Sequence, residues 1–313
     1  MLSYALGLGR YWAFNHIPSR PDDLRIETTN RCNLQCTICD RSAMTKAVEA
    51  MDWNLFEKIC SDAVDLGISR IGLNRFGEPL LHPRLPEMVA FAKARGAKRV
   101  DITTNGLLLT EEKSTLLLEA GLDQIAVSVD GFLKETYEKI RIGSSYDKVV
   151  NNIHRFIALR NKINPKARVR LNFVITIDTF PEIRSFYKYW IRHVDGIWFI
   201  PFMAYGNVRN LSPLKRSKKK SKCSMLWHML VASTDGSAGV CCHGDPNGVL
   251  NIGDLHVRDI ADVWNGPEVE RIRRVHFEKR WKELPICAQC DLIAPYSTWV
   301  RHYCNVYKKI FLL

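Results

Sequence analysis

The stretch Arg31-Cys-Asn-Leu-Gln-Cys-Thr-Ile-Cys39 sets Cys32, Cys36 and Cys39 at a Cys-x3-Cys-x2-Cys spacing. Three thiolates at this spacing can bind one cubane iron-sulfur cluster and leave its fourth iron without a protein ligand. A structural metal site is closed by the protein, whereas a site one ligand short keeps a position open for a substrate or cofactor. The stretch therefore predicts a cluster whose open iron chelates a small molecule.

Zinc or a disulfide would explain the same cysteines in another way. A zinc knuckle needs a fourth Cys or His nearby. Between Leu24 and His82 the further candidate is Cys60, which lies on a helical pattern of apolar residues. The missing fourth ligand therefore favours the open cluster over both alternatives.

With this motif the chain resembles the radical S-adenosylmethionine (radical SAM) superfamily. The resemblance implies that the amino and carboxylate groups of SAM occupy the open iron of a 4Fe-4S cluster. It also implies that an electron from the cluster cleaves the sulfonium of SAM, and that the resulting 5'-deoxyadenosyl radical abstracts hydrogen. An external electron donor such as flavodoxin or ferredoxin is then expected.

The composition favours a large soluble enzyme. The chain has 313 residues, enough to bury a full core in one or two domains. Its ten cysteines do not indicate a secreted disulfide framework, and motif-spaced thiols favour a reducing compartment, so a cytoplasmic location is predicted. Met1 to Gly9 lack a preceding basic region, which argues against a signal peptide. No run of apolar residues reaches the length of a transmembrane helix, so no membrane span is predicted.

The formal net charge of +12 is concentrated in one segment. Seven basic residues and no acidic one lie between Arg209 and Lys222. A block of like charge with Ser and Pro indicates first a solvated linker, and second a patch for phosphate or an acidic partner. Because no aromatic residue interleaves the block as a stacking surface, nucleic acid is not expected as a partner.

From Leu24 to Pro201, short β-branched runs alternate with amphipathic stretches. Strands are predicted at residues 24–28, 69–73, 99–103, 124–129, 168–176 and 196–200, and helices at 53–66, 85–95, 111–120, 134–140, 147–161 and 181–193. These six strand-helix steps predict an α/β fold with a parallel sheet and right-handed crossovers. The resemblance makes it a partial (β/α)6 barrel, with function at the carboxyl ends of the strands.

The loop after the second predicted strand, Asn74-Arg-Phe-Gly-Glu-Pro79, resembles the family's Gly-Glu-Pro element. In the family, the backbone and the carboxylate of this element receive the ammonium of SAM, which makes Gly77, Glu78 and Pro79 candidate contacts. The family's longer form has a further glycine where this chain has Phe76.

Two later loops resemble the elements that line the ribose and methionine of SAM. They are Thr103-Thr-Asn-Gly106 and Ser128-Val-Asp-Gly131. The candidate contacts there are Thr104, Asn105, Ser128 and Asp130. Asn-Gly and Asp-Gly also form turns in any protein, so the simpler interpretation stays open.

Arg170 and Asn172 alternate with apolar neighbours on the fifth predicted strand. Both are expected to point into the barrel, although a strand facing solvent would show the same alternation. Asn172 is a further candidate for cofactor binding, and both residues are candidate substrate contacts together with Asp130.

The cysteines beyond the basic segment resemble the SPASM/Twitch extension, which carries an auxiliary 4Fe-4S cluster. Cys223 and Cys241 show the Cys-x17-Cys interval of that extension, and Gly236 stands five residues before Cys241. Cys287-Ala-Gln-Cys290 closes the set. The predicted ligands are Cys223, Cys241, Cys287 and Cys290, with Cys242 as a competitor of Cys241. Four thiolates would also suit zinc in a ribbon-like site, and that alternative stays open.

A complete SPASM domain needs further cysteines, but Tyr296 stands where the next is expected and Cys304 alone remains beyond it. One auxiliary cluster in a shortened, Twitch-like domain is therefore predicted, with Cys60 and Cys304 as incidental thiols. The predicted segments are an N-terminal extension (1–22), the radical SAM barrel (23–208), the basic linker (209–222) and the auxiliary cluster domain with its tail (223–313).

A fully ligated auxiliary cluster has no open iron for substrate, so its expected task is to accept or relay a second electron. We therefore predict a net two-electron oxidation, with no catalytic side chain assigned. The resemblance to one-cluster Twitch enzymes, which include dehydrogenases of secondary alcohols, implies a small sugar or aminocyclitol-like substrate. The first alternative is crosslinking or epimerisation of a ribosomally made peptide; epimerisation would need a hydrogen donor, for which Cys242 and Cys304 are the candidates. A non-enzymatic iron-sulfur carrier is the second.

Overall fold

The computed structural model describes residues 18–203, 211–213, 220–291 and 293. Six parallel strands stand side by side in the order β6-β5-β4-β3-β2-β1. They are β1 (Asp23–Ile26), β2 (Arg70–Gly72), β3 (Val100–Thr104), β4 (Gln124–Ser128), β5 (Arg168–Ile175) and β6 (Gly196–Pro201). The parallel sheet and its strands therefore lie where the sequence predicted them, with each boundary within two residues.

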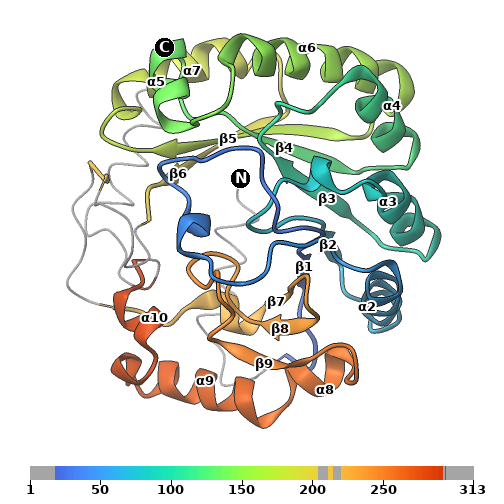
Figure 1. The fold of residues 1–313 in the computed structure, drawn as a ribbon, viewed down its shortest axis with the longest axis vertical. Helices are drawn as coiled ribbons and strands as arrows, with labels where there is room; N and C mark the ends of the chain where they lie inside the picture. Colours follow the sequence, from blue (N-terminus) through green and yellow to red (C-terminus); the bar gives the residue numbers. More distant parts are fainter. Residues whose placement is uncertain (1–17, 204–210, 214–219, 292, 294–313) are drawn as a thin grey trace.

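Six helices cover the outer, convex side of these strands (Figure 1). They are α2 (Trp53–Asp65), α3 (Leu85–Ala94), α4 (Glu111–Glu119), α5 (Lys134–Ile140), α6 (Tyr146–Ile163) and α7 (Ile183–Trp190). Their apolar faces pack on outward-facing strand residues such as Ile71 and Phe173, which are fully buried. Asp52 fixes the start of α2, because its side chain accepts from the backbone N–H groups of Asn54 and Leu55.

The chain departs from six regular strand-helix steps between β4 and β5, where it forms both α5 and α6. The α5 helix ends at Ile140, and Gly143, at a φ of 92°, lets the chain reverse before α6 begins. The amide N–H of Thr37 donates to the carbonyl of Ile140 at 2.9 Å. The extra helix thus brings residues 140–142 against the cysteine loop that follows β1.

Three further strands continue the same sheet beyond β1. β7 (Met229–Ala232) pairs in parallel with β1, and β8 (Ser237–Gly239) and β9 (Asn251–Asp254) follow in antiparallel order. The helices α8 (Ile260–Trp264), α9 (Pro267–Phe277) and α10 (Pro285–Gln289) complete this region, drawn in orange and red in Figure 1. The C-terminal cysteine region is therefore joined to the barrel strands through continuous strand pairing.

Several sequence predictions fall on residues outside the described part of the chain. These are most of the N-terminal extension, most of the basic linker, Tyr296, Cys304 and the C-terminal tail. Within the residues that are described, no helix is long and apolar enough to cross a membrane.

Four charged side chains on the inner face of β1 to β3 pair with one another. Asp23 and Arg25 on β1, Arg70 on β2 and Asp101 on β3 form a ring of four ion pairs between 2.5 and 3.2 Å. Burial alone would raise the pKa of Asp101, but Arg25 and Arg70 lower it to about 2. The interior of this barrel is thus held together by paired charges.

Candidate functional site

The loop after β1 brings the three N-terminal cysteines together. Cys32, Cys36 and Cys39 are partly buried, and both Cys32 and Cys39 interact electrostatically with the Cys36 thiol. Burial raises the pKa of Cys36 to about 11 and also raises that of Cys39. Three buried thiols close together favour a cationic group that would convert them to thiolates, and an iron cluster is such a group.

Arg141 lies beside this loop and was not singled out from the sequence. Backbone N–H groups on either side of Cys36, from Gln35 and Thr37, donate to the carbonyls of Ile142 and Ile140 at 3.0 and 2.9 Å. These two bonds hold the Arg141 guanidinium 3.8 Å from the Cys36 sulfur. Its positive charge opposes the rise in the pKa of Cys36. No sequence signal links residues 105 positions apart, so only the fold reveals this contact.

Asp130 binds Arg141 from the other side. Its carboxylate accepts from Arg141 Nε at 2.8 Å and from the backbone N–H of Val174 at 2.6 Å, and the side chain is fully buried. The Asp130 carboxylate is therefore engaged by protein groups. This geometry supports a role in orienting Arg141 more than the predicted direct contact with SAM or substrate.

The Gly-Glu-Pro loop packs directly on the cysteine loop. The backbone N–H of Glu78 donates to the carbonyl of Arg31 at 2.7 Å. A Cβ on Gly77 would lie 2.0 Å from the Thr29 carbonyl oxygen and 2.7 Å from that of Arg31, so this close approach requires glycine. Pro79 is buried at the start of a short 3₁₀ turn.

Both carboxylate oxygens of Glu78 accept hydrogen bonds from the protein. Oε1 accepts from the Thr104 hydroxyl at 2.6 Å, and Oε2 accepts from the backbone N–H of Asn105 at 2.7 Å. Burial raises the pKa of Glu78, while these donors oppose the rise. The carboxylate thus positions the β3 loop, which leaves the Gly77–Glu78 backbone as the better placed part of the element for SAM.

Asn105 joins the β3 loop to the cysteine loop. Its Nδ2 donates to Asn33 Oδ1 at 2.8 Å, next to Cys32 in the chain. Together with Thr104, Asn105 therefore acts on loop geometry in this structure. Asn33 is a second residue that the sequence analysis missed.

Orphaned polar atoms gather on the inner face of the strands. Asn172 lies across from Ser128 in the β4–β5 register, and its Oδ1 is buried without a hydrogen-bond partner in the described residues. Asn74, after β2, and Arg170, on β5, also bury polar atoms that lack a partner there. Buried polar groups are almost always paired, so these atoms fit a site completed by a bound ligand.

Cys223, Cys241, Cys287 and Cys290 come together in the C-terminal region. Cys223 interacts electrostatically with the other three, and Cys287 interacts with Cys241 and Cys290. Burial raises the pKa of both Cys241 and Cys287 to about 12. Four neighbouring thiols, one buried and three partly buried, match the donor set of a cluster with no open iron.

Cys242 faces different neighbours from Cys241. Burial raises the pKa of Cys242 to about 11. The Cys242 thiol also interacts electrostatically with Arg25, Asp23 and Arg75, which belong to the barrel. Cys60, by contrast, is fully buried in the apolar core on α2. The nine described cysteines are all free thiols. In the same part of the chain, no three His, Cys, Asp or Glu side chains are grouped for a single metal ion.

Arg75 ties the Gly-Glu-Pro loop to the C-terminal cysteines. Its side chain is 3% exposed and donates to the Ser233 hydroxyl at 2.7 Å and to the carbonyls of Cys241 and Asp245 at 3.2 and 2.7 Å. Glu27 lies 3.9 Å from the same guanidinium. One buried side chain thus fixes the spacing between the two cysteine regions.

The cysteine loop and the C-terminal region also contact each other directly. Lys46 forms an ion pair with Asp235 at 2.8 Å, and the backbone N–H of Thr45 donates to Asn247 Oδ1 at 2.7 Å. Asn247 in turn donates to the carbonyl of Ala43 at 3.0 Å. These contacts close one side of the barrel mouth with C-terminal residues.

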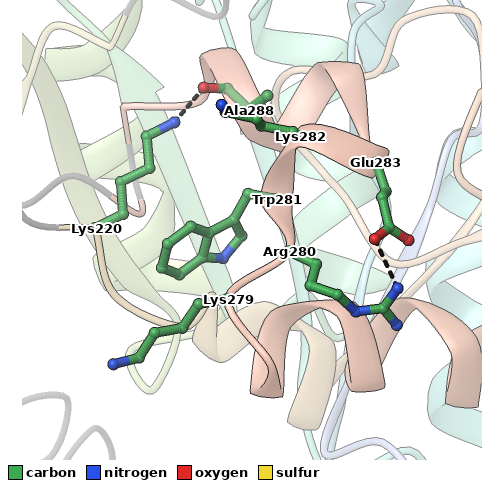
Figure 2. Close-up of a pocket in the computed structure, with 7 residues that line it drawn as sticks. All are labelled: Lys220, Lys279, Arg280, Trp281, Lys282, Glu283 and Ala288. Atoms are coloured by element: carbon green, nitrogen blue, oxygen red, sulfur yellow. Dashed lines mark hydrogen bonds and ion pairs between the residues drawn. The ribbon is translucent and has the colours of Figure 1, made fainter.

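A separate pocket of about 470 Å³ lies against α10, the helix that carries Cys287. Figure 2 shows the Trp281 ring at its centre, with Lys220, Lys279 and Arg280 around it. Lys220 donates to the carbonyl of Ala288 on α10. The lining is basic, with Glu283 as its acidic member.

Comparisons with known proteins agree with this geometry. A model of the radical SAM superfamily matches residues 26–180, and a model of the SPASM iron-sulfur cluster-binding domain matches residues 223–291. A curated relative, the probable GTP 3',8-cyclase of Methanothermobacter marburgensis, is 38% identical over 152 residues, which cover 49% of this chain and 48% of that protein. The chain thus matches about half the length of this relative.

Two solved structures share the fold. BtrN in complex with AdoMet and 2-DOIA has a TM-score of 0.59 and 18% identity, over 86% of this chain and 92% of that one. Streptococcus suis SuiB bound to the precursor peptide SuiA has a TM-score of 0.69 and 15% identity, over 93% of this chain and 73% of that one. At these identities the likeness concerns the fold alone.

The two family models include every cysteine of both predicted sets. Domains of these kinds bind SAM at one 4Fe-4S cluster and carry an auxiliary iron-sulfur cluster. The orphaned polar atoms inside the barrel and the two groups of buried thiols fit these cofactors. The chain therefore belongs to the radical SAM superfamily and is an enzyme with a C-terminal SPASM domain.

Proposed function

We propose that the enzyme oxidises a small sugar or cyclitol by two electrons, converting a secondary alcohol to a ketone. The observation that carries this proposal is the group of four thiols at Cys223, Cys241, Cys287 and Cys290. With these ligands an auxiliary cluster has no open iron for substrate, which suits it to electron transfer. We take Cys241 as its ligand because Cys287 interacts with Cys241, whereas Cys242 interacts with barrel residues.

When bound, the first cluster and SAM supply a 5'-deoxyadenosyl radical, and the auxiliary cluster supplies an acceptor for one electron. Such an oxidation removes one hydrogen atom, one electron and one proton, for which the radical, the auxiliary cluster and water would be the respective acceptors. Cys32, Cys36 and Cys39 would hold the first cluster. The backbone at Gly77, with Ser128 and Asn172, would orient SAM, and Arg141 would place positive charge beside the cluster.

Arg75 supports a working connection between the two cluster sites. Its guanidinium holds the carbonyl of Cys241 from the same loop that carries Gly77. A fixed separation matters for oxidation, because the substrate radical must lose its electron before it takes back a hydrogen atom. We regard the shortened, one-cluster Twitch-like form of the domain as part of this proposal.

The named relatives support two other substrates, which the same experiment would detect. The cyclase relative favours a purine nucleotide, and the SuiB complex favours a ribosomally made peptide. The family match does not support the non-enzymatic carrier, because the chain carries the SAM loops as well as both cysteine sets.

The test supplies candidate sugars, cyclitols, GTP and peptides, each deuterated at the reacting carbon, to the reconstituted enzyme. The expected result is deuterium in 5'-deoxyadenosine, with one ketone formed per SAM cleaved, for a sugar or cyclitol. Deuterium transfer from GTP or a peptide alone would replace the proposal with the corresponding alternative. Release of unlabelled 5'-deoxyadenosine without substrate would show that SAM cleavage itself is intact.

We further propose that the electron donor is an acidic carrier such as flavodoxin or ferredoxin, which docks at the basic pocket beside α10 (Figure 2). The expected effect of Lys279→Glu with Lys282→Glu is slower SAM cleavage with flavodoxin and an unchanged rate with dithionite. Equal rates with flavodoxin in wild type and variant would exclude this docking site.

A further inference from the structure

Arg170 lies on the inner face of β5. Its neighbours Val169 and Leu171 are fully buried in the apolar core, so alternation turns Arg170 to the opposite side. Its charge interacts with Arg70, Asp101, Arg25 and Arg99 on or beside β1 to β3. Since β1 stands four places from β5 in the sheet, these interactions must cross the interior of the barrel.

The charges around Arg170 do not balance. Asp23 and Asp101 are both taken by Arg25 and Arg70, in the ring of four ion pairs. Two further guanidiniums share this interior and form no ion pair with a carboxylate in the described residues. The first is that of Arg99, which donates to the neutral side-chain oxygen of Gln124 at 2.7 Å. The second is Arg170 itself. Around Arg170, four guanidiniums therefore face two carboxylates, which leaves an excess of positive charge in this part of the barrel.

Arg170 is also held in place and short of polar partners. Its guanidinium stacks on the Trp198 ring of β6, 3.6 Å from the ring centroid, and the residue is 9% exposed. Its Nε is buried without a hydrogen-bond partner in the described part of the chain. Burial and the nearby arginines lower the pKa of Arg170 to about 10. A buried, stacked guanidinium beside uncompensated positive charge requires an anion to complete it.

Asn172 extends this arrangement toward the barrel mouth. It lies two residues further along the same face of β5, about 6.6 Å from Arg170. Its Oδ1 also lacks a partner among the described residues, and its neighbours in register are Ser128 and Trp198. An anion at Arg170 would thus sit below the polar groups that the proposed function gives to SAM and substrate.

We propose that Arg170, stacked on Trp198, anchors an anion-binding subsite that receives a phosphate or carboxylate of the substrate. This inference rests on the proposed function and narrows its substrate class. A cationic aminocyclitol would meet the positive interior unfavourably. A sugar phosphate or a sugar acid would complete it.

The test titrates the cluster-loaded, SAM-saturated enzyme with inorganic phosphate, acetate and glycerol by calorimetry. Saturating SAM keeps its own carboxylate site filled, so any anion that binds reports a second site. The expected result is saturable binding of phosphate or acetate and none of glycerol. Preference for phosphate identifies a phosphorylated substrate, and preference for acetate identifies a carboxylate.

Arg170→Gln should lower the affinity for the anion at least about tenfold, as expected for loss of a charge-assisted hydrogen bond. The matched control is Arg168→Gln, on the same face of β5 but exposed, which should bind the anion like wild type. Arg170→Lys keeps the positive charge but lacks the planar, multi-donor guanidinium, so it should bind the anion with intermediate affinity. Iron content establishes that each variant holds both clusters.

Three results would overturn the proposal: wild type binds neither anion, Arg170→Gln binds it equally well, or Arg170→Gln instead loses affinity for SAM. The last result would show that Arg170 binds SAM and not the substrate. The proposed function fails separately, if no sugar or cyclitol transfers deuterium to 5'-deoxyadenosine.

Discussion

The guanidinium of Arg75 donates a hydrogen bond to the carbonyl oxygen of Cys241 across 3.2 Å, although 166 residues separate them in the chain. Arg75 belongs to the loop after β2 that resembles the SAM-binding element, and Cys241 belongs to the auxiliary cysteine set. The side chain that joins the two regions is buried. The two cluster sites of this enzyme therefore form one mechanically connected unit.

Arg75→Ala should destabilise this unit. The change removes the guanidinium that donates to the carbonyls of Cys241 and Asp245, and it removes a charge beside Glu27. We expect a loss of about 1–3 kcal/mol in the free energy of unfolding, measured by urea titration of the cluster-free protein. The midpoint potential of the auxiliary cluster should also fall, because a nearby positive charge favours the reduced form.

The matched control for Arg75 is Arg84→Ala. Both arginines stack on an aromatic ring, Arg75 on Phe76 and Arg84 on Trp53, but the Arg84 side chain is 47% exposed. Arg84→Ala should change the free energy of unfolding and the midpoint potential of the auxiliary cluster little. A potential that stays at the wild-type value in Arg75→Ala would contradict the electrostatic part of the argument.

Gly77→Ala should separate the Gly-Glu-Pro loop from the cysteine loop. The added Cβ would meet backbone oxygens of Thr29 and Arg31 at 2.0 and 2.7 Å, and backbone cannot rotate aside as a side chain can. We expect lower iron occupancy at the first site and weaker SAM binding, measured by iron content and EPR after anaerobic reconstitution.

Gly196→Ala provides the comparison for Gly77→Ala, because a Cβ there meets nothing within 4 Å. It should reconstitute like wild type. If both glycine variants load iron and bind SAM normally, the close approach at Gly77 does not matter for assembly.

The two cysteine sets should account for two clusters. Replacing Cys32, Cys36 and Cys39 together by alanine should reduce the iron content from about eight to about four per chain. A wild-type content of about four that falls to none would leave zinc or no metal at the C-terminal set, and would remove the electron acceptor from the proposed function.

Cys241→Ala and Cys242→Ala should differ. The first removes a thiol that interacts with Cys223 and Cys287, so the auxiliary cluster signal should disappear from the EPR spectrum. The second removes a thiol directed toward Arg25 and should leave the signal in place. The reverse pattern would assign the ligand to Cys242.

Asp101 should make the barrel sensitive to acid. The pKa of Asp101 is 3.8 in the unfolded chain and about 2 in the fold, so its ion pairs stabilise the fold at pH values above 3.8. This stabilisation, about 2 kcal/mol, is lost as the pH falls from about 4 to about 2. Urea unfolding of the cluster-free protein across this range measures it.

Asp101→Asn should remove most of that pH dependence while lowering stability at neutral pH. Asp65→Asn is the control, since Asp65 pairs with Arg95 at the surface and its side chain is 69% exposed. If the free energy of unfolding of Asp101→Asn still falls at acid pH as in wild type, another carboxylate causes the effect.

Local sequence was sufficient for the elements and for the membership of both cysteine sets. Strand and helix positions follow from apolar periodicity, which depends on neighbours within one or two turns. Cys32, Cys36 and Cys39 are close in the chain, so their spacing alone restricts what they can bind. The sequence also identified Gly77, whose need for a small side chain the close approach to Thr29 explains.

Tertiary structure decided the roles of single polar side chains. Glu78 and Asp130 were predicted to contact SAM, yet their carboxylates already accept from Thr104, Asn105 and Arg141. A motif identifies a residue type at a position. Which groups that residue hydrogen-bonds depends on which donors and acceptors the fold brings within about 3 Å of it.

The sequence by itself determined the parallel α/β fold, through local periodicity, and the superfamily, through the resemblance of its motifs. Only the tertiary structure decided that Arg141 contacts Cys36, that Arg75 joins the two cluster regions, and that Arg170 faces uncompensated positive charge. The physical reason is distance: charge and hydrogen bonding act over a few ångströms in space, whatever the separation along the chain.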